Sequence, residues 1–132
     1  MATRIQSLFL VQASITIASN EDMQETIAFF ENDGVTPIPL DGIEFTAIAK
    51  TDRASNAPYV AWATLGAALK LPSQTPRGLF LTSGNLLSFY APFRSSGQRP
   101  IAGSYVFDAL ASADGLTRRV VDGTLTVIQG VT

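Results

Sequence analysis

Two residue types that carry out much of protein chemistry are missing from this sequence. Its 132 residues include no histidine and no cysteine. The chain therefore lacks the usual general base near neutral pH, the commonest metal ligand, thiolates and disulfides. A serine–lysine pair would need one of the two lysines, Lys50 and Lys70, and neither follows a serine at Ser-x-x-Lys spacing. We expect both lysines to be solvated surface charges.

Carboxylates are the remaining candidates for catalysis, because two of them acting together can cleave a glycosidic bond. Four aspartates occur in turn sequences, where such side chains usually bond the backbone: Asp33, Asp41, Asp114 and Asp122. Asp108 instead lies within an alternating stretch, where we expect it to point outward and pair with Arg118 or Arg119. A small hydrolase using Asp108, Asp52 and Glu44 is the third of three function classes considered.

Signatures of cofactors and nucleic acids are also absent from the sequence. No Gly-x-Gly occurs, and no acidic segment has the spacing of a calcium loop. Four arginines could form a basic patch beside aromatic residues, as in single-strand nucleic-acid surfaces: Arg94, Arg99, Arg118 and Arg119. The net charge of −2 and the pI of about 4.9 favour ordinary surface charges instead. The sequence predicts no catalytic residue, no metal, no cofactor and no nucleic-acid partner.

No segment of the chain is predicted to enter a membrane. The longest stretches without formal charge, 54–69 and 78–93, are broken by polar residues and fall short of ~20 apolar residues. The apolar stretch Leu8–Val11 is too short for a signal peptide. We expect residues 1–13 to form an N-terminal arm or an extra strand.

Alternation of apolar and polar residues with a period of two predicts strands along most of the chain. These strands cover residues 14–18, 24–31, 43–50, 59–65, 78–82, 86–90, 104–111 and 118–129. Asp114-Gly115 predicts a hairpin turn, and Asp122-Gly123 predicts either a bulge or a second turn. Residues 61–71 predict a strand through Trp62 and then a short helix or an irregular loop, and residues 93–100 predict a loop.

Short strands separated by turns predict a single all-β domain over residues 1–132, either a sandwich or a small barrel. We favour an Ig-like antiparallel β-sandwich of about 7–9 short strands with little helix. Gly103, Tyr105 and Phe107 resemble the entry into the sixth strand of such a sandwich, where the tyrosine hydroxyl bonds the chain just upstream. The alternative is a plain strand with two inward aromatic rings. In both cases we assign Gly103, Tyr105, Phe107 and Trp62 to the core or to this corner.

The composition predicts a surface that is poor in charge. Charged residues make up 15% of the chain, against roughly 25% in an average domain. Hydrophobic residues make up 46%, and the mean hydropathy is +0.22. Aromatic residues in a charge-depleted surface are typical of an interface, so we expect partners to cover part of this protein. The predicted contact residues are Leu8, Phe9, Tyr90 and Phe93.

The C-terminal half contains the patterns Gly103-x-Tyr105-x-Phe107-Asp108-Ala109-Leu110, Ala113-Asp114-Gly115 and Val121-x-Gly123-x-Leu125-x-Val127. These patterns resemble a module of tailed-bacteriophage virion accessory proteins. Such Ig-like modules occur in tail, neck and baseplate-associated proteins, including the N-terminal domain of baseplate upper proteins. Residues 23–30, 39–42 and 43–49 look like the opening hairpin of that family. Ala109 departs from the leucine usual after the aspartate, and residues 59–77 match nothing in the family.

This resemblance implies a non-enzymatic structural subunit of a virion, assembled in the host cytoplasm. Such a subunit would bind copies of itself and dock other virion proteins or fibres. The family has no catalytic residues to carry over. The alternative hypothesis is a carbohydrate-binding or host-surface-binding module that stacks a glycan on Trp62 and Tyr59.

Overall fold

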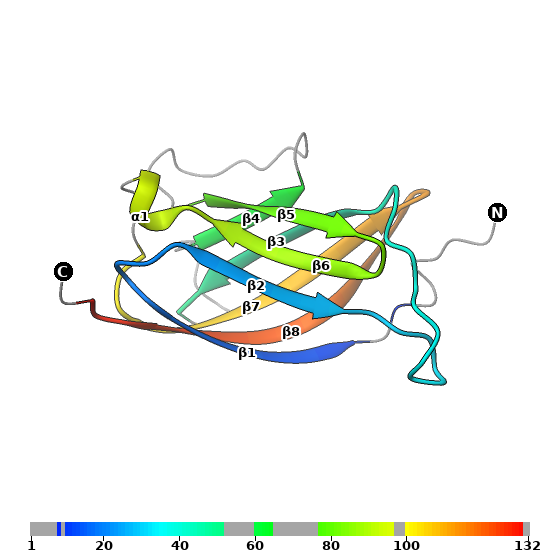
Figure 1. Cartoon of the computed structure of the whole chain (residues 1–132), viewed down its shortest axis with the longest axis horizontal. Helices are drawn as coiled ribbons and strands as arrows, with labels where there is room; N and C mark the ends of the chain where they lie inside the picture. Colours follow the sequence, from blue (N-terminus) through cyan, green and yellow to red (C-terminus); the bar gives the residue numbers. More distant parts are fainter. Residues whose placement is uncertain (1–7, 9, 52–59, 65–76, 97–99, 131–132) are drawn as a thin grey trace.

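The computed structural model describes residues 8, 10–51, 60–64, 77–96 and 100–130. Its elements are β1 (Val11–Ala18), β2 (Met23–Ala28), β3 (Glu44–Lys50), β4 (Val60–Thr64), β5 (Arg77–Ser83), β6 (Leu86–Ala91), α1 (Phe93–Ser96), β7 (Gly103–Ala113) and β8 (Leu116–Ile128). The strands form one sheet in the order β1-β8-β7-β3-β4-β5-β6-β2, which curls until it is nearly a barrel (Figure 1). The predicted all-β fold with little helix is confirmed.

The sheet consists of two four-stranded halves that β3 and β4 join. We call β1-β8-β7-β3 the first half and β4-β5-β6-β2 the second half. Because β3 and β4 are paired from Thr46↔Ala63 to Ala49↔Val60, the halves are continuous and not separate sheets. Two pairs, β1·β8 and β4·β5, are parallel, whereas we expected antiparallel strands. Parallel neighbours need a long connection, and 12 residues separate Thr64 from Arg77.

Aromatic rings from both halves fill the interior of the curled sheet. Five aromatic residues on the strands are at most 2% exposed: Phe45, Trp62, Phe80, Phe89 and Phe107. The ring centroids of Phe89 on β6 and Phe107 on β7 lie 5.5 Å apart, although these strands are not neighbours in the sheet. Trp62 packs against both, at 5.4 and 6.0 Å. The halves are therefore packed on each other through the interior, as the core assignment of Trp62 and Phe107 requires.

The hairpin between β7 and β8 forms where Asp114-Gly115 predicts it. Ala113 pairs with Leu116, and Asp114 and Gly115 have φ angles of 53° and 79°, the signs of a type I′ turn. At Asp122-Gly123 the strand simply continues. The bulge lies earlier in β8, since Ala109 pairs with Val121 while Leu110 pairs with Arg119.

Gly123 has a packing role in the interior. A Cβ atom added there would lie 2.3 Å from Cζ of Phe107, too close for any real contact. The residue opposite Phe107 must therefore be glycine for this ring to lie flat on β8. This explains why a turn-forming residue occurs in the middle of a strand.

The corner predicted around Tyr105 is present. The Tyr105 hydroxyl donates a hydrogen bond to the carbonyl of Ile101, four residues upstream. Gly103 has a φ of 154°, which glycine reaches more easily than other residues. Tyr105 and Phe107 are both buried, so the corner and the inward aromatic pair occur together.

The two segments expected to reach outward are partly built into the domain. Val11–Ala13 belong to β1, and Leu8 is only 1% exposed, so the end of the supposed arm is part of the fold. Residues 1–7 and 9 lie outside the described residues. The predicted loop 93–100 begins with α1, whose first turn is tied to the β1–β2 connection because the Arg94 N–H donates to Oδ1 of Asp22.

Candidate functional site

The carboxylate singled out in the sequence, Asp108, is bound in an ion-pair network on the outer surface. Its Oδ1 accepts a hydrogen bond from Nε of Arg119 at 2.7 Å, and Nη2 of Arg119 lies 2.8 Å from Oδ1 of Asp122. The hydrogen bond to Asp108 raises the pKa of the Arg119 guanidinium above its usual value. The expected cross-strand pair with an arginine of the following strand is therefore present, with Arg119 as the partner.

The two described acids considered for hydrolysis, Glu44 and Asp108, do not form a catalytic pair. On the paired strands, Glu44 lies opposite Ser112 and Asp108 lies opposite Ile48. Four residues of strand, about 13 Å at ~3.3 Å per residue, separate these positions. Paired catalytic carboxyl groups lie only ~5–9.5 Å apart. Asp52 lies outside the described residues.

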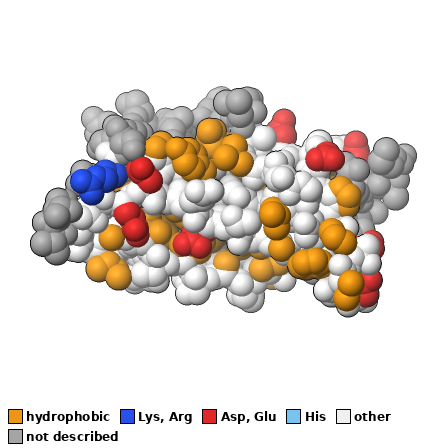
Figure 2. Space-filling model, viewed as in Figure 1, with side chains coloured by type: hydrophobic (Ala, Val, Ile, Leu, Met, Phe, Trp, Pro, Cys, Tyr) orange, Lys and Arg blue, Asp and Glu red, His pale blue; other side chains and the backbone are white. Residues whose placement is uncertain are grey.

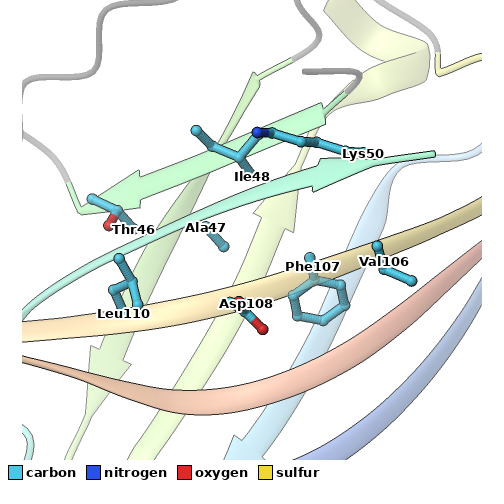
Figure 3. A pocket seen from close by; sticks show the side chains of 8 residues that line it. All are labelled: Thr46, Ala47, Ile48, Lys50, Val106, Phe107, Asp108 and Leu110. Atoms are coloured by element: carbon cyan, nitrogen blue, oxygen red, sulfur yellow. The ribbon is translucent and has the colours of Figure 1, made fainter. Parts of the chain in front are cut away.

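A shallow hollow of about 230 Å³ lies on the outside of β3 and β7 (Figure 3). The side chains that alternate to this face include Thr46, Ile48, Val106 and Leu110, together with Lys50 and Asp108. One cation and one carboxylate that already binds Arg119 do not constitute a catalytic centre. The hollow is a groove in a mixed surface, and we assign no ligand to it.

The described part of the chain contains neither a metal site nor the basic patch considered for nucleic acid. It contains no group of three or more acidic side chains placed to hold a metal ion. Of the four arginines, Arg94 lies on α1 at one end of the barrel, and Arg118 and Arg119 lie near the β7–β8 turn at the other (Figure 1). The described arginines therefore do not gather into one basic patch. Arg99 lies outside the described residues. Among the helical residues described, none forms a helix long and apolar enough to cross a membrane.

Two of the predicted contact residues belong to the core. Leu8 and Phe93 are 1% and 0% exposed, because the approach to β1 and the turn α1 fold both side chains inward. Their assignment to the surface was wrong. Phe9 lies outside the described residues. Tyr90 is half-buried on the outside of β6, where it remains accessible.

The tryptophan proposed as a glycan platform is not on the surface either. Trp62 is 0% exposed, and its position between Phe89 and Phe107 leaves neither ring face free. Its Nε1 donor has no hydrogen-bond partner among the described residues. The stacking role assigned to Trp62 was therefore wrong, and Tyr59 lies outside the described residues.

The outer surface of β5, β6 and β2 differs from the rest of the exterior. Alternation from the buried residues Phe80, Leu87 and Phe89 places nine described side chains on it: Gln24, Thr26, Ala28, Leu79, Leu81, Ser83, Leu86, Ser88 and Tyr90. None of the nine is charged, and we call this surface the uncharged face. Arg77 begins β5, but its side chain is outside those described. Figure 2 shows hydrophobic side chains gathered over β5, with acidic side chains to the left of them and below them.

Strand register brings the apolar side chains of the uncharged face together. Leu79 pairs with Tyr90, and Leu81 pairs with Ser88, whose Oγ lies 3.0 Å from Oγ1 of Thr26. Leu81 and Leu86 are 48% and 40% exposed. Large apolar side chains in a surface without charge are typical of the centre of a protein interface.

The leucines of the uncharged face were missed in the sequence. Their signal is the run Gly78-Leu79-Phe80-Leu81 and the pair Leu86-Leu87, where consecutive residues are apolar. Alternate side chains of a strand point to opposite faces, so such runs indicate apolar residues on both sides of the sheet. Only Tyr90 was assigned to an interface and is found on this face.

Comparisons with known proteins add no assignment. No protein-family model matches the chain, and no curated protein sequence matches it either. The features that bear on function are therefore the outer surfaces of the two halves and the edges of the sheet.

Proposed function

We propose that this protein is a non-enzymatic structural subunit of a phage-type virion, in the tail, neck or baseplate. It binds copies of itself and docks neighbouring virion proteins or fibres. It needs no cofactor, nucleic acid or membrane, and it acts within the particle after assembly in the host cytoplasm. The observation that supports this proposal best is the uncharged face, which exposes leucines on a rigid sheet and has no charged side chain among those described.

The physical reason is the cost of leaving such a surface in water. Each Å² of apolar surface removed from water contributes roughly 25 cal/mol. Strands held in one sheet also lose little conformational entropy when a partner docks on them, so most of that gain is retained. The resemblance of the C-terminal half to virion accessory modules supplies the class of partner.

The other two function classes have less support. The glycan-binding hypothesis has lost Trp62 as its aromatic platform. The hydrolase hypothesis has lost the pair of Asp108 and Glu44, because these two described carboxylates are too far apart along β3 and β7.

Immunogold electron microscopy tests the proposal directly. Antibodies against the purified chain would be applied to particles released by cells that carry the gene. We expect gold at one fixed position on tailed particles. Label that remains in the soluble fraction, with none on particles, would refute the virion assignment. The reading frames flanking the gene give an independent check, because we expect them to encode tail-assembly proteins.

A further inference from the structure

β1 is one of the two edges of the curled sheet. It pairs on one side with β8, from Val11↔Val121 to Ala18↔Ile128. Among the described residues, no strand pairs with its other side. Figure 1 shows β1 and β2 separating after their shared turn, with β1 staying beside β8 and β2 beside β6. Within the part of the chain that the structure describes, the edge of β1 is therefore available to another strand.

The backbone groups that point away from β8 can be identified from the register. The Ser19 N–H donates to the Ile128 carbonyl, so this residue faces β8. Since alternate residues of a strand bond opposite neighbours, Ile17, Ile15 and Ala13 also face β8. The N–H and C=O groups of Gln12, Ser14 and Thr16 point outward from the sheet edge. All three side chains are exposed.

From Gln12 to Thr16, β1 lacks the features that protect exposed edges, whereas the Ala18 N–H at its end donates to Oε1 of Glu21. Its sequence, Val-Gln-Ala-Ser-Ile-Thr-Ile-Ala, contains no charge, proline or glycine, and its pairing with β8 has no bulge. Native edge strands usually carry one of these to prevent pairing with another chain. The opposite edge strand, β2, carries the exposed Glu25 in its middle. The chain protects one edge and leaves the other open.

We propose that the β1 edge pairs with the β1 edge of a second copy, antiparallel and around a two-fold axis. This inference rests on the proposed function and names the contact through which the subunit binds itself. A two-fold axis near Ser14 places Gln12 opposite Thr16 and Ser14 opposite Ser14 of the other copy. Three residues that each exchange two bonds would give about six backbone hydrogen bonds.

A second copy suits this edge because every residue would meet an uncharged counterpart. Ser14 already receives a hydrogen bond from the Thr124 hydroxyl at 3.4 Å, so its side chain lies against its own barrel and clear of the edge. The same two-fold pairing of β2 would bring two copies of Glu25 close together, and like charges across a strand pair repel. Self-pairing is therefore favoured at β1 and opposed at β2.

A matched pair of proline variants separates the two edges. Thr16→Pro removes an outward N–H from β1. Thr26→Pro does the same on β2. The Phe29 N–H donates to the Asn85 carbonyl and therefore points toward the β6 side. Because alternate residues of a strand point their N–H groups to opposite sides, the Thr26 N–H points outward. Proline is tolerated in an edge strand where its missing N–H faces solvent. By sedimentation equilibrium, we expect Thr16→Pro to raise the dimer dissociation constant roughly 30-fold or more, because each copy loses a donor and gains a blocking ring. Thr26→Pro should leave it unchanged.

Amide hydrogen exchange of the unmodified protein covers the case in which a proline variant fails to fold. We expect protection of the Gln12, Ser14 and Thr16 amides to rise with protein concentration, while the Thr26 amide exchanges at a constant rate. Protection that is already complete in dilute protein would mean that these groups are bonded within one chain, which overturns the inference.

A dimer that Thr16→Pro does not weaken also overturns the inference, while leaving self-association intact. A chain that stays monomeric contradicts this inference and the self-association in the proposed function, whereas label on particles would still support the virion assignment.

Discussion

The two halves of the sheet share one interior but have opposite exteriors. The outer surface of the first half carries five charged residues: Glu44, Lys50, Asp108, Arg119 and Asp122. The uncharged face of the second half has no charged side chain among those described. The edge strands show the opposite distribution of charge. The first half ends in β1, which has no charged residue, and the second half ends in β2, which carries Glu25. Each half therefore leaves a different route to association open, an edge in one and a face in the other.

From this difference we expect fold stability and the proposed association to depend on separate sets of residues in this chain. The buried rings hold the two halves together, and changes to them should affect both halves equally. We expect the outer side chains and the two edges to determine what the barrel binds. Substitutions can therefore test the exterior difference without changing the interior.

The largest effect is expected for Phe107→Ala. Its ring contacts Trp62 and Phe89 of the second half, so its removal leaves a cavity between the halves. We expect the free energy of unfolding, measured in urea, to fall by ~3–5 kcal/mol. The neighbouring Val106→Ala, on the outside of the same strand, should cost less than ~1.5 kcal/mol. Equal costs would mean that the interior is not shared in this way.

The next effect concerns the two faces. Leu81→Glu introduces a charge into the uncharged face, and Leu110→Glu introduces the same charge into the charged surface of the first half. Both side chains are exposed, so each change should alter the free energy of unfolding by only ~0.5 kcal/mol. We expect Leu81→Glu to reduce incorporation into particles, counted by immunogold label, at least roughly tenfold, which corresponds to ~1.4 kcal/mol of docking energy. Equal incorporation of both variants would remove the distinction between the faces.

A smaller effect is expected from the ion pairs of the first half. Arg119→Ala removes the partner of Asp108 and Asp122, but all three side chains are partly exposed and screened by solvent. We expect only a small shift of the urea unfolding midpoint, far below that of Phe107→Ala and decreasing as salt is added. A shift as large as that of Phe107→Ala, unchanged by salt, would show that this network contributes to the core.

The smallest effect lies in the exposed turn after β2. Hydrogen bonds from the Thr36 hydroxyl and the Thr36 and Val35 N–H groups lower the pKa of Asp33 to about 2, from 3.8. Because the folded pKa is depressed, the stabilisation is complete above pH 3.8 and is lost as the pH falls toward 2. An NMR titration should show the Asp33 carboxyl protonating near pH 2, and Thr36→Val should raise this pKa. A titration at 3.8 would mean that the turn is not formed.

Much of the fold could be predicted because it depends on local signals. Alternation located all eight strands, and Asp114-Gly115 located the hairpin because two adjacent positive φ angles require such residues. The parallel pairs could not be predicted, because strand order depends on contacts between residues far apart in the sequence. The bulge was predicted at Asp122-Gly123 but lies at Val120. The prediction was wrong because glycine is typical of turns and bulges, whereas Gly123 leaves space for the Phe107 ring.

The candidate surface was harder to predict than the fold. Aromatic residues in uncharged segments suggested an interface, but a large ring fills an interior as readily as it covers a surface. Phe93 and Trp62 are therefore inside, and only Tyr90 is outside among the described aromatic candidates. The open edge of β1 could not be recognised before the strand order was known, since any of the eight strands could have occupied that position.

The mass of the chain in solution tests the central claim most directly. Sedimentation equilibrium over a wide concentration range should show the mass rising from the 14.0 kDa of one chain toward twice that value. A mass of 14.0 kDa at every concentration, for a protein that is folded by circular dichroism, would contradict the account.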